Sequence, residues 1–286
     1  MRAGWNEVEP AALPALRLSE RIRLGLRLAW ALAALLMLFA LFLPLRGIDL
    51  AAERLAGRPV TRLGNAVVRL WAAQALPTLG LAFVRHGTPM RGGGAFVANH
   101  SSWIDIVALQ RAAAPFLVSK AEVRDWPGVG LIGRAIGTMF IDRRPGEAKR
   151  QEAALLARLR KGDQMALFPE GTSTDGSRVL PFKSTLFGAF YAPGIKQGVA
   201  VQPVTIVYRP RPGLPASFYG WWGEMDFASH AGDVLARSAG GVIELTFHPP
   251  LPLADFADRK TLAQAADASV RAGLDAARLS ADRLGR

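Results

Sequence analysis

The chain contains no cysteine among its 286 residues. Disulfides, thiolate metal ligands and a cysteine acyl-enzyme are therefore excluded, and cysteine content says nothing about the redox compartment. The sequence also lacks the H-E-x-x-H, G-x-S-x-G, Walker and dinucleotide-binding patterns. Three of its four histidines, His86, His230 and His248, have no partners at metal-ligand spacing. We expect these three to be structural or surface residues, and we expect no metal site.

Acidic residues are scarce, with 23 Asp and Glu against 35 Lys and Arg, for a formal net charge of +12. Such a surface suits anionic lipid, nucleic acid or acidic substrates. Half of the residues are hydrophobic, and the mean hydropathy is +0.18. The apolar N-terminal part favours lipid, so we expect a lipid bilayer as partner and no nucleic acid.

The longest apolar run covers residues 28–45, which are 18 uncharged and mostly aliphatic residues. As a helix it would be roughly 27 Å long, barely the thickness of a bilayer core. Pro44 and Arg46 end the run and no small-residue cleavage site follows, which disfavours a signal peptide. A weaker apolar segment covers 65–84, and arginines flank both sides of the first run, so the positive-inside rule gives no orientation. We expect residues 1–85 to form a pair of membrane-associated helices that either enter the bilayer and return or lie partly in one leaflet.

From residue 86 onward, short β-rich runs alternate with helical stretches. This alternation predicts an α/β domain over 86–286, with a mixed, largely parallel sheet flanked by helices. The predicted strands are 95–98, 116–119, 138–142, 165–168, 199–208 and 242–247, and the predicted helices are 102–112, 146–160, 183–192 and a terminal amphipathic helix over 262–284.

The block Asn99-His-Ser-Ser-Trp-Ile-Asp105 stands between a predicted strand and a predicted helix. Ligands of α/β proteins bind at such strand ends. His100 and Asp105 would lie about 140° apart on one continuous helix, so they meet only if His100 lies in the turn and Asp105 in the first helical turn. The carboxylate would then orient the imidazole as a general base. The competing interpretation is that Asp105 only caps the helix.

Two more polar blocks follow strands. The strand over 138–142 ends in Arg143 and Arg144, whose guanidinium groups suit a phosphate or carboxylate. The turn after Phe168 carries Glu170, Gly171 and Thr172, where a carboxylate can accept substrate hydroxyls and backbone N–H groups can face an anion. The alternatives are a solvated strand end and an ordinary turn.

Three further features have competing explanations. Lys183 adds positive charge near the Glu170 turn, or is a surface lysine. The proline of Gln202-Pro203-Val204 suggests an edge strand or a bulge. The aromatic residues of 218–222 favour core packing over contact with a membrane interface.

Taken together, these blocks resemble the glycerolipid acyltransferase family, of the bacterial 1-acylglycerol-3-phosphate acyltransferase type. Residues 99–105 are similar to the family's N-H-x-x-x-x-D motif, and 137–143 to its G-x-x-F-I-x-R motif. Residues 168–172 are similar to its F-P-E-G-T motif, and 202–204 to its proline-containing block. The four blocks occur in the family's order, and the resemblance covers about residues 86–210.

The resemblance implies roles for individual residues. It implies that His100 is the catalytic base and Asp105 its orienter. It implies that Arg143 binds the anionic head group of the acceptor and that Glu170 contacts acceptor hydroxyls. We include Asn99, Arg144, Gly171, Thr172 and Lys183 as further substrate-binding candidates.

One position departs from the family's pattern. Members that act on lysophosphatidate usually read F-P-E-G-T-R-S, whereas this chain has Ser173 in place of that arginine. A charge-assisted contact to an anion contributes on the order of 1.5–3 kcal/mol, so its loss matters for a phosphate. Either Arg144 or Lys183 compensates, or the acceptor is not a simple phosphate monoester. The surrounding residues look similar to the lyso-ornithine lipid acyltransferase branch.

The expected function is therefore acyl transfer to the hydroxyl of a lyso-lipid, either lyso-ornithine lipid or 1-acylglycerol-3-phosphate. Acyl-CoA or acyl-carrier protein would be the co-substrate, and no other cofactor is expected. The expected location is the inner membrane, with the catalytic domain on its cytoplasmic face. Two alternatives remain open: a non-catalytic basic protein that binds anionic lipid, and a lipid hydrolase that uses the same His/Asp pair.

Overall fold

The computed structural model describes residues 13–57, 60, 62–125, 129–141, 148–195 and 198–283. An eight-stranded sheet lies at the centre, in the order β1-β7-β6-β2-β5-β3-β4, with β8 paired to β6. Only the pairs that β6 makes with β7 and β8 are antiparallel. The mixed, largely parallel sheet predicted from the alternation is confirmed. The strands are β1 (Leu81–His86), β2 (Gly94–Ala98), β3 (Phe116–Lys120), β4 (Met139–Ile141), β5 (Gln164–Leu167), β6 (Ala200–Arg209), β7 (Gly241–Phe247) and β8 (Leu251–Pro252).

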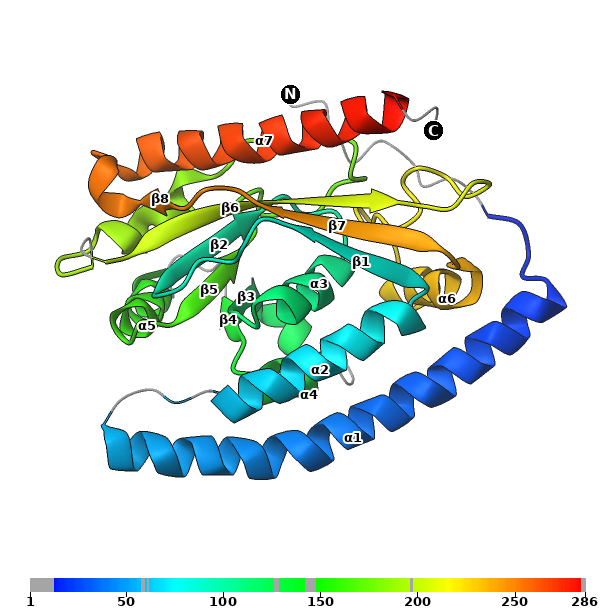
Figure 1. Ribbon diagram of the computed structural model, residues 1–286, viewed down its shortest axis with the longest axis horizontal. Coiled ribbons are helices and arrows are strands. Elements are labelled where there is room, and N and C mark those ends of the chain that lie inside the picture. The colour runs from blue at the N-terminus through cyan, green and yellow to red at the C-terminus, as the bar shows by residue number, and fades with distance from the viewer. Residues whose placement is uncertain are drawn as a thin grey trace.

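Helices cover both faces of the sheet because the central strands are apolar on both sides (Figure 1). In β2, Phe96 and Ala98 pack toward α2 (Arg62–Thr78), α3 (Ile104–Ala112) and α6 (Phe227–Arg237). The alternate residues, Ala95 and Val97, pack toward α5 (Ala148–Arg160) and α7 (Arg259–Arg283) on the other face. This double burial is typical of parallel sheets. The shorter helices are α4 (Val129–Ala135) and three 3₁₀ segments, Ala121–Asp125, Ser184–Tyr191 and Leu253–Asp255.

The first helix, α1 (Leu18–Ala56), is longer than the apolar run predicted. It continues through Pro44 for 39 residues and ends at Gly57, whose φ of 62° is left-handed. The expectation that Pro44 and Arg46 end the element was wrong. The residues beyond Pro44 remain helical because they are tied to α2: Asp49 accepts hydrogen bonds from the backbone N–H groups of Leu63 and Gly64 at 3.2 and 2.8 Å.

The second apolar segment is not one helix. Helix α2 ends at Thr78, and residues 81–86 form strand β1, which pairs with β7. Gly80 makes this transition with a φ of +72°, and a Cβ there would lie 2.3 Å from the carbonyl oxygen of Ser238. Periodicity alone missed the strand because its apolar residues continue those of the helix. The sheet therefore begins at Leu81, before the expected boundary at residue 86.

Arginines of α1 attach this helix to α6. Arg23 donates to the carbonyl oxygen of Ala236 at 2.9 Å, and Arg27 donates to those of Leu235 and Ser238 at 2.8 and 2.7 Å. Carbonyl oxygens at the C-terminal end of a helix carry partial negative charge and lack intrahelical partners, so guanidinium groups are suitable partners. Arg23 and Arg27 therefore make contacts within the protein, between α1 and the end of α6.

Most apolar side chains of α1 face away from the protein. In Figure 1, α1 is the outermost layer and α2 lies between it and the sheet. Within the described residues, α1 is the one helix long and apolar enough to cross a membrane, and 11% of its most apolar window is buried. The exposed apolar residues include Leu28, Trp30, Leu32, Leu36, Met37, Leu41 and Leu43.

Two smaller expectations are corrected. Strand β6, which contains Pro203, lies inside the sheet and not at its edge. Residues 200–201 of β6 pair with β8 and residues 204–209 pair with β7, so Pro203 lies between the two ladders, where a missing N–H breaks neither. The helix predicted over 183–192 is a 3₁₀ helix, Ser184–Tyr191. The predicted core packing around 218–222 is confirmed for Phe218, Tyr219 and Trp222, which are buried.

Candidate active site

The site begins where β2 ends, at Asn99. Its side-chain amide is buried; it donates to the carbonyl oxygen of Ile206 at 2.9 Å and accepts from the N–H of the same residue at 2.8 Å. An amide side chain is suited to this double contact because it has one donor and one acceptor side by side. Asn99 thus fastens the turn after β2 to β6, and its amide group is engaged within the protein.

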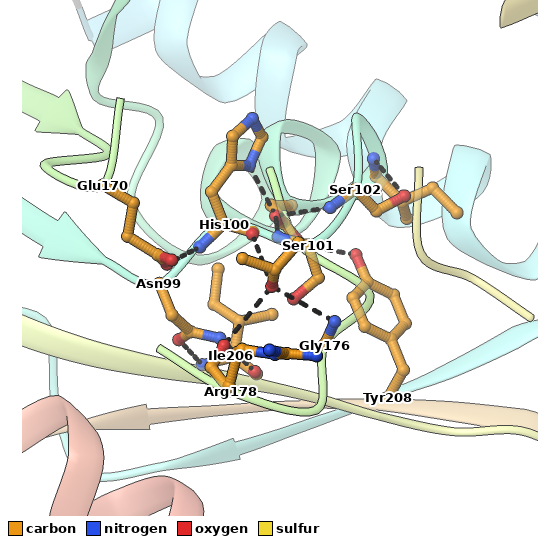
Figure 2. Close-up of polar contacts among 12 residues, drawn as sticks. Asn99, His100, Ser101, Ser102, Glu170, Gly176, Arg178, Ile206 and Tyr208 are labelled. Carbon is orange, nitrogen blue, oxygen red and sulfur yellow. Dashed lines mark hydrogen bonds and ion pairs between the residues drawn. The ribbon is translucent and has the colours of Figure 1, made fainter. Parts of the chain in front are cut away.

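His100 and Asp105 meet as the spacing required. His100 lies in the turn, Asp105 lies in the first turn of α3, and the imidazole Nδ1 is 2.8 Å from the carboxylate Oδ2 (Figure 2). The imidazole stacks on Phe168, with ring centroids 4.1 Å apart and planes 20° apart. Asp105 is fully buried, whereas 18% of the His100 side chain is exposed. In the described part of the chain, no group pairs with Nε2, the other ring nitrogen.

The Asp105 carboxylate accepts four hydrogen bonds. The N–H groups of Ser101 and Ser102 donate to Oδ2 at 2.8 and 2.9 Å, beside the imidazole. The hydroxyl of Tyr208 donates to Oδ1 at 2.5 Å (Figure 2). The carboxylate contacts the imidazole, as the first interpretation requires. The N–H groups that it binds belong to Ser101 and Ser102, before α3, and this helix has no side-chain hydrogen bond at its N-cap, so the capping interpretation is wrong.

Glu170 holds the two loops of the site together. Its Oε1 accepts from the N–H of His100 and its Oε2 from the N–H of Leu180, both at 2.7 Å. Burial is the main cause that raises the pKa of Glu170 to about 8, while the two N–H donors lower it. Its side chain is nearly inaccessible to solvent, at 1% exposure. Glu170 lies beside the His100–Asp105 pair and makes contacts within the protein.

The turn of residues 170–176 lies against the His100 turn. The N–H of Thr174 donates to the carbonyl oxygen of His100 at 2.9 Å. Gly171 has a φ of +73°, and a Cβ there would lie 2.5 Å from Nζ of Lys183. The exposed Lys183 ammonium therefore lies over Gly171, and Thr172 follows it in the same turn. One positive charge thus stands over the turn that follows Glu170.

The structure brings seven of the nine predicted site residues to one end of the sheet: Asn99, His100, Asp105, Glu170, Gly171, Thr172 and Lys183. Arg143 and Arg144 lie outside the described residues. Among the residues that are described, no group of three or more His, Asp or Glu is placed to hold a metal ion. Sequence reasoning missed Tyr208, because a tyrosine at the end of a long strand carries no local signal of a distant carboxylate.

The sequence is similar to known proteins over most of its length. The Acyltransferase family profile matches residues 82–207. A lyso-ornithine lipid O-acyltransferase from Rhodobacter capsulatus is 43% identical over 94% of this chain and 96% of its own length. One of the same name from Pseudomonas aeruginosa is 37% identical over 87% of this chain and 94% of its own length.

A solved structure shares the fold. The crystal structure of the 1-acyl-sn-glycerophosphate acyltransferase from Thermotoga maritima superposes with a TM-score of 0.63 at 20% identity, over 91% of this chain and 98% of that one. Similarity over nearly the whole length shows that the chain belongs to the glycerolipid acyltransferase family and is an acyltransferase.

Proposed function

We propose that this acyltransferase moves a fatty acyl group from acyl-CoA or acyl-carrier protein to the hydroxyl of lyso-ornithine lipid, with His100 as general base. The observation that carries the mechanism is the contact of 2.8 Å between His100 Nδ1 and Asp105 Oδ2. With Nδ1–H donated to the carboxylate, the lone pair of Nε2 is free to take a proton. Nε2 belongs to a partly exposed side chain, so a substrate hydroxyl can reach it.

The reaction then needs no protein nucleophile. The acceptor oxygen attacks the thioester carbonyl while its proton passes to Nε2 of His100. An oxygen–carbon bond forms, the carbon–sulfur bond breaks, and the proton on the imidazole passes to the leaving thiolate. Asp105 stabilises the imidazolium between these two transfers.

We assign stabilisation of the oxyanion to the turn of residues 170–176, which lies against the His100 turn. The N–H of Gly171 donates to the carbonyl oxygen of Phe168 at 3.0 Å and is committed to the turn. The N–H groups of Thr172 and Ser173, which follow it, have no hydrogen-bond partner in the described part of the chain. Together with the Lys183 ammonium they supply positive potential where the thioester oxygen becomes negative.

The preference for lyso-ornithine lipid as acceptor rests on two observations. The relatives from Rhodobacter capsulatus and Pseudomonas aeruginosa carry that substrate in their names and align over most of this chain. Ser173 also stands where lysophosphatidate-specific members usually have an arginine. A free hydroxyl on an acyl chain and a zwitterionic head group need one fewer guanidinium than a phosphate monoester does.

The proposal includes docking to the bilayer through α1. Exposed leucines on this helix, including Leu32, Leu36 and Leu43, offer apolar surface that lipid tails would cover. Lyso-lipid would then reach the site from the bilayer, and soluble acyl donors from the aqueous side. Because those donors are cytosolic, we place the catalytic domain on the cytoplasmic face of the inner membrane.

The test is a matrix of two acceptors and two donors with the purified full-length protein. Labelled acyl-CoA or acyl-carrier protein is incubated with lyso-ornithine lipid or lysophosphatidate, and the acylated lipid is measured. We expect most product from lyso-ornithine lipid. Dominant phosphatidate formation would contradict the proposed acceptor, and release of free fatty acid would indicate a hydrolase. Lipid binding with no product from any pair would favour the non-catalytic alternative.

Ser173→Arg sharpens the acceptor assignment. Restoring a guanidinium beside the site is expected to raise kcat/KM for lysophosphatidate about tenfold, the lower end of a charge-assisted contact. The matched control Ser173→Gln has a long polar side chain without the charge and should leave this ratio unchanged. An equal gain in both variants would contradict a missing phosphate contact.

A further inference from the structure

The two oxygens of the Asp105 carboxylate have different partners. Oδ2 accepts the imidazole Nδ1 and two backbone N–H groups, whereas Oδ1 accepts the hydroxyl of Tyr208 at 2.5 Å. Tyr208 belongs to β6, and Asp105 is 103 positions earlier in α3. The contact therefore holds the carboxylate from the sheet, on the side opposite to its own helix.

Tyr208 is itself held in place. Its ring stacks on Tyr219, with centroids 5.4 Å apart and planes 27° apart. The hydroxyl of Tyr219 is 2.7 Å from Oγ of Ser238, whose carbonyl oxygen accepts from Arg27 of α1. Gly241 leaves room for this arrangement, because a Cβ there would lie 2.0 Å from the Tyr219 hydroxyl. The phenol of Tyr208 is thus fixed before any substrate binds.

We infer that Tyr208 is a positioning residue for the catalytic pair: its hydroxyl fixes the plane of the Asp105 carboxylate and limits the charge that this carboxylate presents to His100. The inference rests on the proposed general-base role of His100. It adds a third side chain to the pair, from a position of β6 that lies outside the family-like block 202–204 of the same strand.

The first consequence is geometric. Rotation about χ2 moves both carboxylate oxygens, so the Tyr208 contact with Oδ1 adds to the three contacts of Oδ2 in resisting that rotation. Terminal torsions of aspartate are broad, and a base displaced by a fraction of an ångström transfers protons less efficiently. Loss of the hydroxyl is therefore expected to lower kcat.

The second consequence is electrostatic. A hydrogen bond donated to a carboxylate stabilises its charge and weakens the attraction it exerts on a neighbouring cation. Burial first, and the charge of Asp105 next, raise the pKa of Tyr208 well above its ordinary value, so the phenol stays a donor across the assay range. Without this hydrogen bond, the Asp105 carboxylate would attract the imidazolium more strongly.

Few other groups that titrate or carry charge face this pair. Glu170 lies beside His100 after β5, Lys183 lies over the adjacent Gly171, and Tyr219 stacks behind Tyr208. On α6, His230 accepts from the indole of Trp103, and burial lowers the pKa of His230. Arg271 of α7 acts electrostatically on Glu170. None of them touches Oδ1 of Asp105, so its charge is set chiefly by Tyr208.

The test is the pH profile of Tyr208→Phe, which removes the hydroxyl and keeps the ring. We expect kcat on the alkaline plateau to fall about tenfold, and the acidic limb of the profile to move to higher pH by about half a unit or more. The acceptor KM should be unchanged. An acidic limb at the wild-type pH would overturn the inference, even if the rate fell, because a purely structural loss does not move it.

Two further variants make the result unambiguous. Tyr219→Phe removes the neighbouring buried hydroxyl, which contacts Ser238 and not Asp105, so its acidic limb should stay in place. His100→Ala separates the two proposals: an active His100→Ala contradicts the general-base mechanism. An inactive His100→Ala, combined with an unmoved limb in Tyr208→Phe, contradicts only the positioning role.

Fluorotyrosine covers the case in which Tyr208→Phe fails to fold. The chain has three tyrosines, so incorporation into a Tyr191→Phe, Tyr219→Phe background labels position 208 alone. A more acidic phenol is a stronger donor to Asp105 and should move the acidic limb to lower pH. A shift in the other direction, or no shift, would overturn the inference.

Discussion

The turn of residues 99–105 and the helix α1 differ in whether their side chains find partners within the protein. In the turn, the side chains of Asn99 and Asp105 are buried, and their polar atoms pair with groups from β6, with the imidazole of His100 and with backbone N–H groups of the turn. Along α1, large apolar side chains such as Leu32 and Leu36 remain exposed, at 59% and 63%. The polar atoms of these two side chains of the turn have their partners within the chain, whereas α1 leaves its apolar face exposed.

This difference separates the region proposed to carry out the reaction from the region proposed to bind the bilayer. A base must have one geometry, and internal hydrogen bonds from several elements can supply it. A surface for lipid needs area and little geometry, so exposed leucines on one side of a helix suffice. The two regions meet at α6, where arginines of α1 bind the last carbonyl oxygens of the helix. Changes in the two regions should therefore affect different measurements.

The largest effect is expected from His100→Ala. General-base catalysis typically contributes roughly 10²–10⁴-fold, so kcat should fall by that factor. Asp105 keeps its three other hydrogen bonds in this variant, so the protein should still fold, with a lower thermal midpoint because the stack of the imidazole on Phe168 is lost. The measurements are product formation from lyso-ornithine lipid and a melting curve. Near-wild-type turnover would remove His100 from the mechanism, and a collapsed melting curve would show that the turn depends on it for folding.

Leu36→Asp is expected to act on location and not on chemistry. Leucine and aspartate differ by about 3 kcal/mol or more in the apolar part of a bilayer, which corresponds to about a hundredfold in partitioning. Flotation with vesicles should therefore lose most of the bound protein. The rate on acceptor dispersed in detergent should be close to that of the wild type, because Leu36 lies on α1 and contributes nothing to the His100 turn.

Leu279→Asp is the matched control. Leu279 is 58% exposed on α7, which lies on the face of the sheet opposite to α1 (Figure 1). The same substitution there adds the same charge and should leave flotation unchanged. Equal losses from both variants would mean that charge, and not the apolar face of α1, controls binding to the vesicles.

Much of the fold could be predicted because alternation of short strands and helices is a local property. The residues of β2 are apolar on both faces, and the turn chemistry after Ala98 is visible in sequence. Strand β1 could not be predicted, because Leu81 and Val84 extend the apolar spacing of α2. Its identity depends on pairing with β7, which begins 160 positions later and leaves no trace near residue 81.

In the site, too, contacts between residues close in sequence could be predicted, and contacts between distant residues could not. His100 and Asp105 are close in sequence, and their five-residue spacing already limited how they could meet. The contacts of Asn99 with Ile206 and of Tyr208 with Asp105 cross more than 100 positions. The sequence identifies such residues as polar, but only the sheet order determines which buried groups they satisfy. For that reason Asn99 and Glu170 were expected to contact substrate, whereas the structure places their polar atoms on the backbone.

Asn99→Ala should affect stability more than chemistry. Both amide atoms pair with the backbone of Ile206 in a buried position, so truncation leaves an N–H and a carbonyl oxygen unsatisfied. The expected loss is about 2 kcal/mol in the free energy of unfolding. Gln110→Met is a comparison variant, because it removes one buried bond, to the carbonyl oxygen of Pro115, and should cost less. Denaturant midpoints of the two variants measure the difference.

Glu170 is expected to make the stability of the protein depend on pH. Its pKa is raised from an ordinary value of 4.5 to about 8, so between these values the folded protein holds a proton that the unfolded chain releases. Stability should therefore fall as pH rises from about 5 to 8, by up to about 1.4 kcal/mol per unit of pH. Glu170→Gln cannot titrate, so its free energy of unfolding should lack this slope, although it is lower throughout because one backbone N–H of His100 or Leu180 loses its acceptor. Denaturant unfolding of both proteins across that range measures the two slopes. Parallel slopes would mean that the two N–H donors keep the carboxylate ionised in the folded protein, and that this buried group holds the loops together as a charge.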